Sequence, residues 1–177
     1  LLKSHVEVSR YGNILVLEVA NAPVNAVNGE VRAGLLDGMR AAKVEAAIEI
    51  VVITGRGKNF IAGADLAEFD GSIAAPPYAE VLKAIEESPK PVVCVLHGST
   101  LGAGVEIALA AHYRIALDGS SIGFPEITLG IVPGAGGTQR LPRLIGAEAA
   151  LELLIGGTAI SASRAEALGL VDKLASG

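Results

Sequence analysis

Aromatic residues and basic clusters are scarce in this sequence. Of its 177 residues only 3% are aromatic, none is tryptophan, and the formal net charge is −5. A protein that binds nucleic acid needs cations to neutralise phosphates and commonly uses aromatic rings on which bases stack. The composition therefore argues against a nucleic-acid partner, while backbone amides and a few cations could still hold a small polyanion.

Cysteines and metal-binding patterns are also scarce. Cys94 is the only cysteine, so no internal disulfide can form, and its apolar neighbours predict a buried side chain. A single thiol is compatible with a reducing compartment. The three histidines, His5, His97 and His112, are scattered, and neither a His-x-x-x-His pair nor an acidic calcium loop occurs. We therefore expect no metal site.

Long hydrophobic runs are missing, although 51% of the residues are hydrophobic. The longest apolar stretches are Ile48–Thr54, Pro91–Leu96 and Val105–Ala111, and each is far shorter than the roughly 20 residues that span a bilayer. Residues 1–10 carry dispersed charges and lack the apolar region of a signal peptide. We expect no membrane span and interpret the apolar excess as buried strands and helices.

Segments with strand and helix patterns alternate along the chain. Short, largely apolar runs predict strands at residues 6–8, 14–19, 49–54, 92–96, 113–117 and 121–124, and the run at 49–54 is rich in β-branched residues. Apolar spacing and capping residues predict helices at residues 28–42, 79–87, 105–111, 139–144, 147–155 and 161–167. Loops are expected at residues 72–78, 98–104 and 133–137. Because the central strands are apolar on both faces, we predict an α/β fold with its sheet buried between helices.

Several common catalytic motifs are absent. The string His97-Gly98-Ser99 lacks the Gly-x-Ser-x-Gly elbow of serine hydrolases. Gly55-Arg56-Gly57-Lys58 has neither the spacing of a P-loop nor its following serine or threonine. No Gly-x-Gly-x-x-Gly string occurs, which disfavours a nicotinamide Rossmann site.

Small residues follow two predicted strands, at residues 62–65 and 101–106, and an acidic and glycine-rich segment lies at residues 124–138. Small residues let backbone N–H groups approach a ligand, and a helix N-terminus adds a positive dipole. Two such amides could hold a carbonyl oxygen on which negative charge develops. Glu106 lies in an otherwise apolar helix, where burial would raise its pKa and suit it to acid–base work.

Each of these features has a structural explanation when it is taken alone. Gly102–Gly104 could provide a close helix–strand contact, Glu106 could favour the helix dipole, and Glu126 could be a surface acid after a proline. Gly134–Gly137 could be an ordinary loop. Taken together, the segments favour an oxyanion site, but composition alone does not choose the reaction.

These segments resemble the crotonase (enoyl-CoA hydratase/isomerase) superfamily. The matching strings occur in the family's order and cover nearly the whole chain: Asn21–Val27, Phe60–Leu66, Leu101–Glu106 and Phe124–Leu141. The last string is long and highly specific. Ala111–Ala116 and the short loop Phe69–Tyr78 look most like the hydratase domain of multifunctional β-oxidation enzymes.

The resemblance implies a β-β-α spiral fold and a set of site residues. It implies that the backbone N–H groups of Ala64 and Ala103 form an oxyanion hole, although the second position is often glycine in the family, and that Gly134 helps to hold the catalytic water. The positions expected along coenzyme A are Val24, Ala62, Ala64, Asp65 and Leu66.

The implied activity is hydration of 2-enoyl-CoA thioesters in fatty acid β-oxidation. Glu106 and Glu126 match the two family glutamates: Glu106 would accept a proton from water and Glu126 would deliver one to the α-carbon. Coenzyme A is part of the substrate, and no metal or redox cofactor is required. The alternatives are Δ3-Δ2-enoyl-CoA isomerisation, which needs one proton-shuttling glutamate, and a non-catalytic acyl-CoA-binding module.

Members of this family normally continue into C-terminal helices that cover the acyl pocket and build trimer contacts. We therefore expect residues 1–177 to be one crotonase-like core domain that lacks this helical part and belongs to a longer chain. The intact protein would be a homotrimer or carry a covalently attached dehydrogenase domain. The isolated chain would self-associate or be weakly active. We expect a cytoplasmic location, or a peroxisomal or mitochondrial one in a eukaryote.

Overall fold

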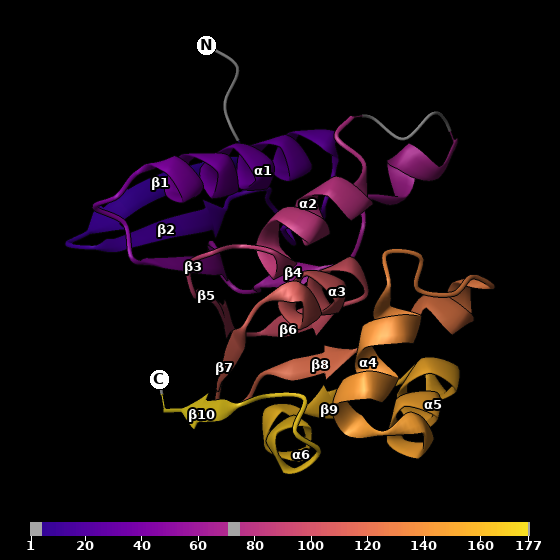
Figure 1. Cartoon of the computed structure of the whole chain (residues 1–177). Helices are drawn as coiled ribbons and strands as arrows, with labels where there is room; N and C mark the ends of the chain where they lie inside the picture. Colours follow the sequence, from indigo (N-terminus) through magenta and orange to yellow (C-terminus); the bar gives the residue numbers. More distant parts are fainter. Residues whose placement is uncertain (1–4, 71–74, 177) are drawn as a thin grey trace.

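The computed structural model describes residues 5–70 and 75–176 (Figure 1). The strands are β1 (Val6–Tyr11), β2 (Ile14–Val19), β3 (Ile50–Gly55), β4 (Ile61–Ala62), β5 (Val92–Leu96), β6 (Ser99–Leu101), β7 (Tyr113–Leu117), β8 (Ser121–Gly123), β9 (Ile160–Ser161) and β10 (Lys173–Ala175). The α-helices are α1 (Gly29–Val44), α2 (Tyr78–Glu86), α3 (Ala103–Ala110), α4 (Gly137–Ile145), α5 (Ala147–Gly156) and α6 (Ala162–Ala167). Two 3-10 helices are η1 (Leu66–Asp70) and η2 (Glu126–Leu129).

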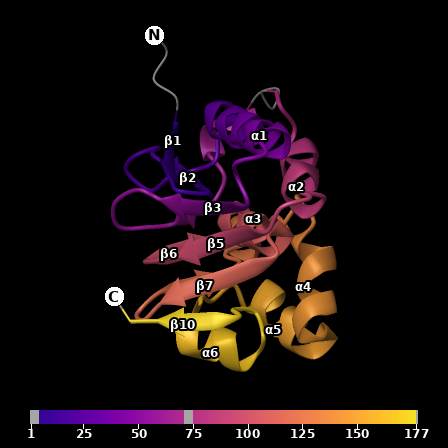
Figure 2. The ribbon, with the colours of Figure 1, turned by 60° about the vertical axis from the view of Figure 1, so that its left-hand side comes forward.

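The strands form two sheets that the chain visits in turn. One sheet has the order β1-β2-β3-β5-β7-β10, with β1 antiparallel to β2 and the other neighbours parallel. The other sheet has the order β4-β6-β8-β9. The chain passes from β3 to β4, from β5 to β6 and from β7 to β8, and then through helices (Figures 1 and 2). This repeated β-β-α path confirms the predicted α/β spiral.

Most of the predicted elements are present near their expected bounds. The hairpin turns at Gly12, which has φ +62°, and β5 and β7 have the predicted limits. Asn28 caps α1, because its side chain accepts a hydrogen bond from the Val31 N–H at 3.0 Å. Ser161 likewise accepts from Arg164 at the start of α6. Residues 71–74, which include part of the predicted loop at 72–78, lie outside the described residues.

The loop predicted at residues 98–104 was partly wrong, because it contains strand β6. Ser99, Thr100 and Leu101 pair in parallel with β8, and Thr100 and Leu101 also pair with β4. A strand of three residues has too few positions to show a periodic pattern. It exists because two neighbouring strands satisfy its backbone groups, which is tertiary information.

The prediction that helices cover both faces of the sheet was also wrong. In β3, Val51 and Ile53 are fully buried, whereas Ile50 and Val52 are partly exposed. The same alternation occurs in β2, β5 and β7. The inward face of the six-stranded sheet packs on the core, and its outward face has partial exposure, because the second sheet and helices α3, α4 and α5 lie on one side of it (Figure 1).

The buried core contains the thiol of Cys94. Its side chain is fully buried, and desolvation raises the pKa of the thiol to about 12. A neutral thiol in apolar surroundings is chemically inert and acts as a small packing group.

Neither a membrane-spanning helix nor a metal cluster occurs among the described residues. In residues 5–70 and 75–176, no helix combines the length and the hydropathy needed to cross a membrane. Across the same ranges, no three His, Cys, Asp or Glu side chains come together in a way that could hold a metal ion.

Candidate active site

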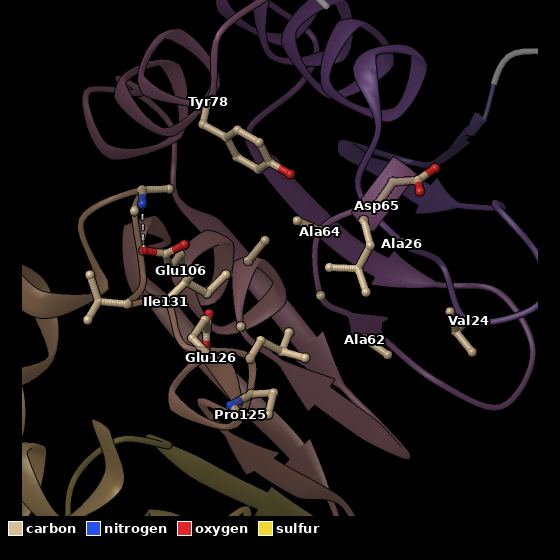
Figure 3. Close-up of a pocket in the computed structure, with 18 of the residues that line it drawn as sticks. Val24, Ala26, Ala62, Ala64, Asp65, Tyr78, Glu106, Pro125, Glu126 and Ile131 are labelled. Carbon is tan, nitrogen blue, oxygen red and sulfur yellow. Dashed lines mark hydrogen bonds between the residues drawn. The ribbon is translucent and has the colours of Figure 1, made fainter. Parts of the chain in front are cut away.

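A mostly apolar cavity of 1010 Å³ lies between the loops that follow β4 and β6, the start of α2, and η2 with the loop after it (Figure 3). All nine site residues expected from the sequence line it: Val24, Ala62, Ala64, Asp65, Leu66, Ala103, Glu106, Glu126 and Gly134. Segments up to 110 residues apart along the chain are thus brought to one site.

Glu106 is held in the cavity wall by two backbone amides. It lies in α3, a helix whose residues are all buried, and Glu106 as a whole is 3% exposed. Its Oε1 accepts hydrogen bonds from the N–H groups of Ala135 at 2.8 Å and Gly137 at 2.7 Å. Burial raises the pKa of Glu106, the two amides oppose that rise, and the charge of Glu126 adds to it.

Glu126 lies at the start of η2, and the environment of its carboxyl group differs from that of Glu106. Its Oε2 is buried and has no hydrogen-bond partner among the described residues. Burial is the main cause that raises the pKa of Glu126. Both carboxyl groups line the same wall of the cavity in Figure 3, facing Ala64. A buried oxygen without a hydrogen-bond partner is energetically unfavourable. We therefore expect Oε2 of Glu126 to bind a proton or to contact a ligand.

The backbone N–H groups of Ala64 and Ala103 are available to a ligand. Ala64 forms a parallel bridge with Val27, but the bridge uses the N–H groups of Val27 and Asp65 rather than that of Ala64. Ala103 is the first residue of α3, where an N–H has no acceptor within the helix. In the part of the chain that the structure describes, neither group donates a hydrogen bond to the protein.

Two glycines next to these groups have different roles. A Cβ on Gly104 would lie 2.3 Å from the carbonyl oxygen of Ile61, so this glycine permits the close helix–strand contact considered from the sequence. A Cβ on Gly102 would instead lie 2.7 Å from Oε1 of Glu126, and Gly102 has φ +50°. Gly102 therefore leaves the space in which the Glu126 carboxylate sits.

Gly102→Ala is expected to displace the Glu126 carboxylate and lower turnover. A shift of about 1 Å in a reacting group can cost on the order of 100-fold in rate. Gly12→Ala is the matched control, because Gly12 also has positive φ, +62°, but nothing lies within 4 Å of its Cβ position. Catalytic turnover and thermal melting are measured for both variants. Equal losses in the two variants would attribute the effect to backbone strain and contradict the role of Gly102.

Several residues that line or support the site were missed from the sequence. The hydroxyl of Tyr78 donates to the Val27 carbonyl at 3.0 Å, and the guanidinium of Arg32 lies 4.6 Å from the centre of its ring. Burial raises the pKa of Tyr78 to about 12, so the phenol stays neutral at the cavity wall. Nothing in the local sequence marks Tyr78, which appears there only as the residue before a helix.

The geometry agrees with the comparison of the sequence with known families. Residues 9–177 match the family described as Enoyl-CoA hydratase/isomerase. The chain belongs to the enoyl-CoA hydratase/isomerase family. The described fold is also that of solved family members: it matches an enoyl-CoA hydratase from Thermoplasma volcanium with a TM-score of 0.90 at 35% identity, covering 98% of this chain and 72% of that one. An enoyl-CoA hydratase from Bacillus anthracis matches with a TM-score of 0.90 at 34% identity, covering 97% of this chain and 70% of that one.

Two curated family members illustrate the range of chain lengths. The peroxisomal bifunctional enzyme of Danio rerio is 46% identical over 162 residues, which cover 92% of this chain and 23% of that protein. The probable enoyl-CoA hydratase of Bacillus subtilis is 40% identical over 165 residues, which cover 89% of this chain and 64% of that protein. The chain therefore spans about a quarter of one relative and less than two thirds of the other.

Proposed function

We propose that this chain adds water across the 2,3 double bond of a 2-enoyl-CoA thioester, as an enoyl-CoA hydratase of fatty acid β-oxidation. The observation that carries the proposal is the pair of carboxyl groups, of the buried Glu106 and the half-buried Glu126, in one mostly apolar cavity that Ala64 and Ala103 also line with unused N–H groups. The family match and the names of the relatives support it.

In the proposed reaction, the N–H groups of Ala64 and Ala103 hold the thioester oxygen, on which negative charge develops as the enolate forms. Glu106 accepts one proton of a water molecule while the water oxygen bonds to the β-carbon. Because Oε1 of Glu106 is held by two amides, Oε2 is the oxygen that would take this proton. Glu126 donates a proton to the α-carbon, and exchange with solvent restores both carboxyl groups.

The remaining lining residues suggest how the substrate lies. We place coenzyme A along Val24, Ala62, Asp65 and Leu66, as the family resemblance implies, with Ala64 beside the thioester. Gly134 would help to hold the water. We propose that no metal or redox cofactor is required, because the thioester itself acidifies the α-position.

A labelling experiment tests the proposed function. Incubating crotonyl-CoA with the chain in ¹⁸O-labelled water should give 3-hydroxybutyryl-CoA that carries one labelled oxygen, detected by mass spectrometry. A 3-enoyl-CoA assayed in parallel tests the isomerase alternative. Conversion of only the 3-enoyl substrate would favour isomerisation over hydration, and tight acyl-CoA binding without any product would support a non-catalytic binding module.

We also propose that residues 1–177 act as one core domain within a larger assembly, either a homotrimer or a chain with a covalent dehydrogenase domain. Large hydrophobic side chains exposed on η2 and α5 support further contacts: Ile127, Leu129, Leu151 and Ile155. Sedimentation of the chain at several concentrations tests for self-association.

We propose a cytoplasmic location, or a peroxisomal or mitochondrial one in a eukaryote. Microscopy of the tagged chain in its source cells tests this.

A further inference from the structure

The guanidinium of Arg140 joins two segments that flank the cavity. It lies in α4 and donates to Glu86 of α2 through Nε at 3.2 Å and through a second nitrogen at 2.7 Å. Its remaining terminal nitrogen donates to the carbonyl oxygen of Ala135 at 3.1 Å. The same guanidinium packs against Gly136, where a Cβ would lie only 2.4 Å from it. Arg140 therefore fixes the loop between η2 and α4 from outside the cavity.

That loop carries the two amides that hold Glu106. The Ala135 residue accepts from Arg140 through its carbonyl and donates to Oε1 of Glu106 through its N–H, and Gly137 provides the second N–H. A continuous series of contacts thus runs from Glu86 through Arg140 and Ala135 to Glu106. Arg140 contacts the groups that orient the carboxylate and does not line the substrate cavity.

We propose that Arg140, oriented by Glu86, is a positioning residue for Glu106. It holds the loop amides in place and keeps the Glu106 carboxylate directed at the reacting water. The proposal rests on the proposed function, because it concerns the group assigned there as the base. It goes further by assigning a role to two residues outside the substrate cavity.

The loop needs such a restraint because of its composition. Gly134, Gly136 and Gly137 give the backbone wide conformational freedom, and Gly136 has φ +100°. A loop of this kind would otherwise sample arrangements in which its N–H groups point elsewhere. A bidentate arginine–carboxylate pair restrains both direction and distance.

The exposure of the Arg140–Glu86 ion pair argues against a role in fold stability alone. The side chain of Arg140 is 23% exposed and that of Glu86 is 52% exposed, and pairs at such a surface contribute little to folding. If the pair acts by positioning, its removal should alter catalysis much more than the melting temperature. If it is merely structural, the reverse should hold.

The charges around Glu106 give the direction of the expected pH effect. Glu126 from η2 and desolvation raise the pKa of Glu106, whereas Arg140 from α4 and the two loop amides lower it, and the neutral Tyr78 of α2 lines the same cavity. Removing Arg140 takes away one charge that favours the carboxylate and loosens the amides. The pKa of Glu106 should therefore rise further, so a base at this position is lost at a higher pH.

Arg140→Met keeps the length of the side chain and removes its donors. We expect kcat for crotonyl-CoA to fall about 10- to 100-fold, as when groups that orient a reacting residue are removed, with KM nearly unchanged. The acidic limb of the profile of kcat/KM against pH should move to higher pH. Arg143→Met is the matched control: Arg143 lies one turn further along α4, and its guanidinium donates to the backbone carbonyl and the side-chain oxygen of Gln139.

Glu86→Gln removes the other half of the pair and should change kcat and the pH profile in the same direction by a smaller factor. The double variant should be no slower than Arg140→Met alone, because both changes act through one contact series. Should Arg140→Met fail to fold, Glu86→Gln carries the same measurements by itself.

A measurement that does not depend on turnover can test the role of Arg140 separately from the proposed function. The carboxyl ¹³C signal of Glu106, assigned with Glu106→Gln, is titrated by NMR in the unaltered chain and in Arg140→Met. A higher midpoint in Arg140→Met supports positioning even if the chain hydrates nothing, in which case only the proposed function fails. An unchanged midpoint together with an unchanged pH profile, or a loss confined to melting temperature, would overturn the inference.

Discussion

Glu106→Gln is expected to lower kcat for the hydration of crotonyl-CoA by about 10²–10⁴-fold, and Glu126→Gln to lower it within the same range, because each general acid–base group typically contributes that much. Glutamine keeps the size and one oxygen of each side chain, so its Oε1 can still accept the hydrogen bonds from the Ala135 and Gly137 N–H groups at position 106. The loss therefore reports proton transfer rather than packing.

Glu106→Gln should lower kcat without lowering the melting temperature of the protein. Burial raises the pKa of the Glu106 carboxyl in the folded state above its ordinary value. The folded state then binds a proton more readily than the unfolded state, so this group favours folding at low pH, and the contribution is lost as pH rises through the folded pKa. Glutamine never ionises, so at neutral pH the variant should melt no lower than the unaltered chain.

An exposed glutamate provides the control for both measurements. Glu148 lies in the first turn of α5 and is exposed, and Glu148→Gln should leave turnover unchanged. Near-normal turnover in Glu106→Gln and Glu126→Gln would exclude the assigned roles. A loss of turnover that merely followed unfolding would contradict the account as well.

Replacing the peptide N–H of Ala103 by an ester oxygen should lower kcat/KM about 10²–10³-fold, the usual cost of removing one oxyanion donor. Incorporating lactic acid at this position makes the change without altering the side chain. Because Ala103 is the first residue of α3, its N–H has no partner within the helix, and the helix loses no internal hydrogen bond.

The control for the ester is Ala147, which is the first residue of α5 and follows a glycine, as Ala103 does. An ester at Ala147 should leave turnover and melting unchanged. If the ester at Ala103 also left turnover unchanged, the N–H of Ala103 in the unaltered chain would not stabilise the thioester oxygen. If both esters reduced activity together with melting temperature, the effect would belong to helix stability.

The parts of this fold that have a local pattern could be predicted from the sequence. The limits of β5 and β7 follow from short, largely apolar runs, and Asn28 could be assigned as a cap because asparagine precedes a helical apolar pattern, which the hydrogen bond from Val31 confirms. The cavity-lining residues followed from the family resemblance, since the motif strings are long and in order. Composition by itself indicated only a small-residue oxyanion site with a buried acid.

The features that could not be predicted from the sequence depend on contacts between distant segments. Strand β6 exists through its pairing with β4 and β8, and the outward face of the large sheet follows from where the second sheet packs. In the sequence, Tyr78 stands just before a predicted helix and Arg140 lies within one, and neither is marked as a site residue. Their importance lies in contacts with Val27 and Glu86, which are 51 and 54 residues away along the chain, so no single segment could reveal it.

The most direct test of the central claim is a crystal structure of the chain with acetoacetyl-CoA, which resembles the product and cannot be hydrated. The account predicts the thioester oxygen within about 2.7–3.1 Å of the backbone nitrogens of both Ala64 and Ala103. It also predicts that the carboxyl groups of Glu106 and Glu126 flank the α- and β-carbons. A thioester bound elsewhere, or one held with either carboxyl group turned away from those carbons, would contradict it.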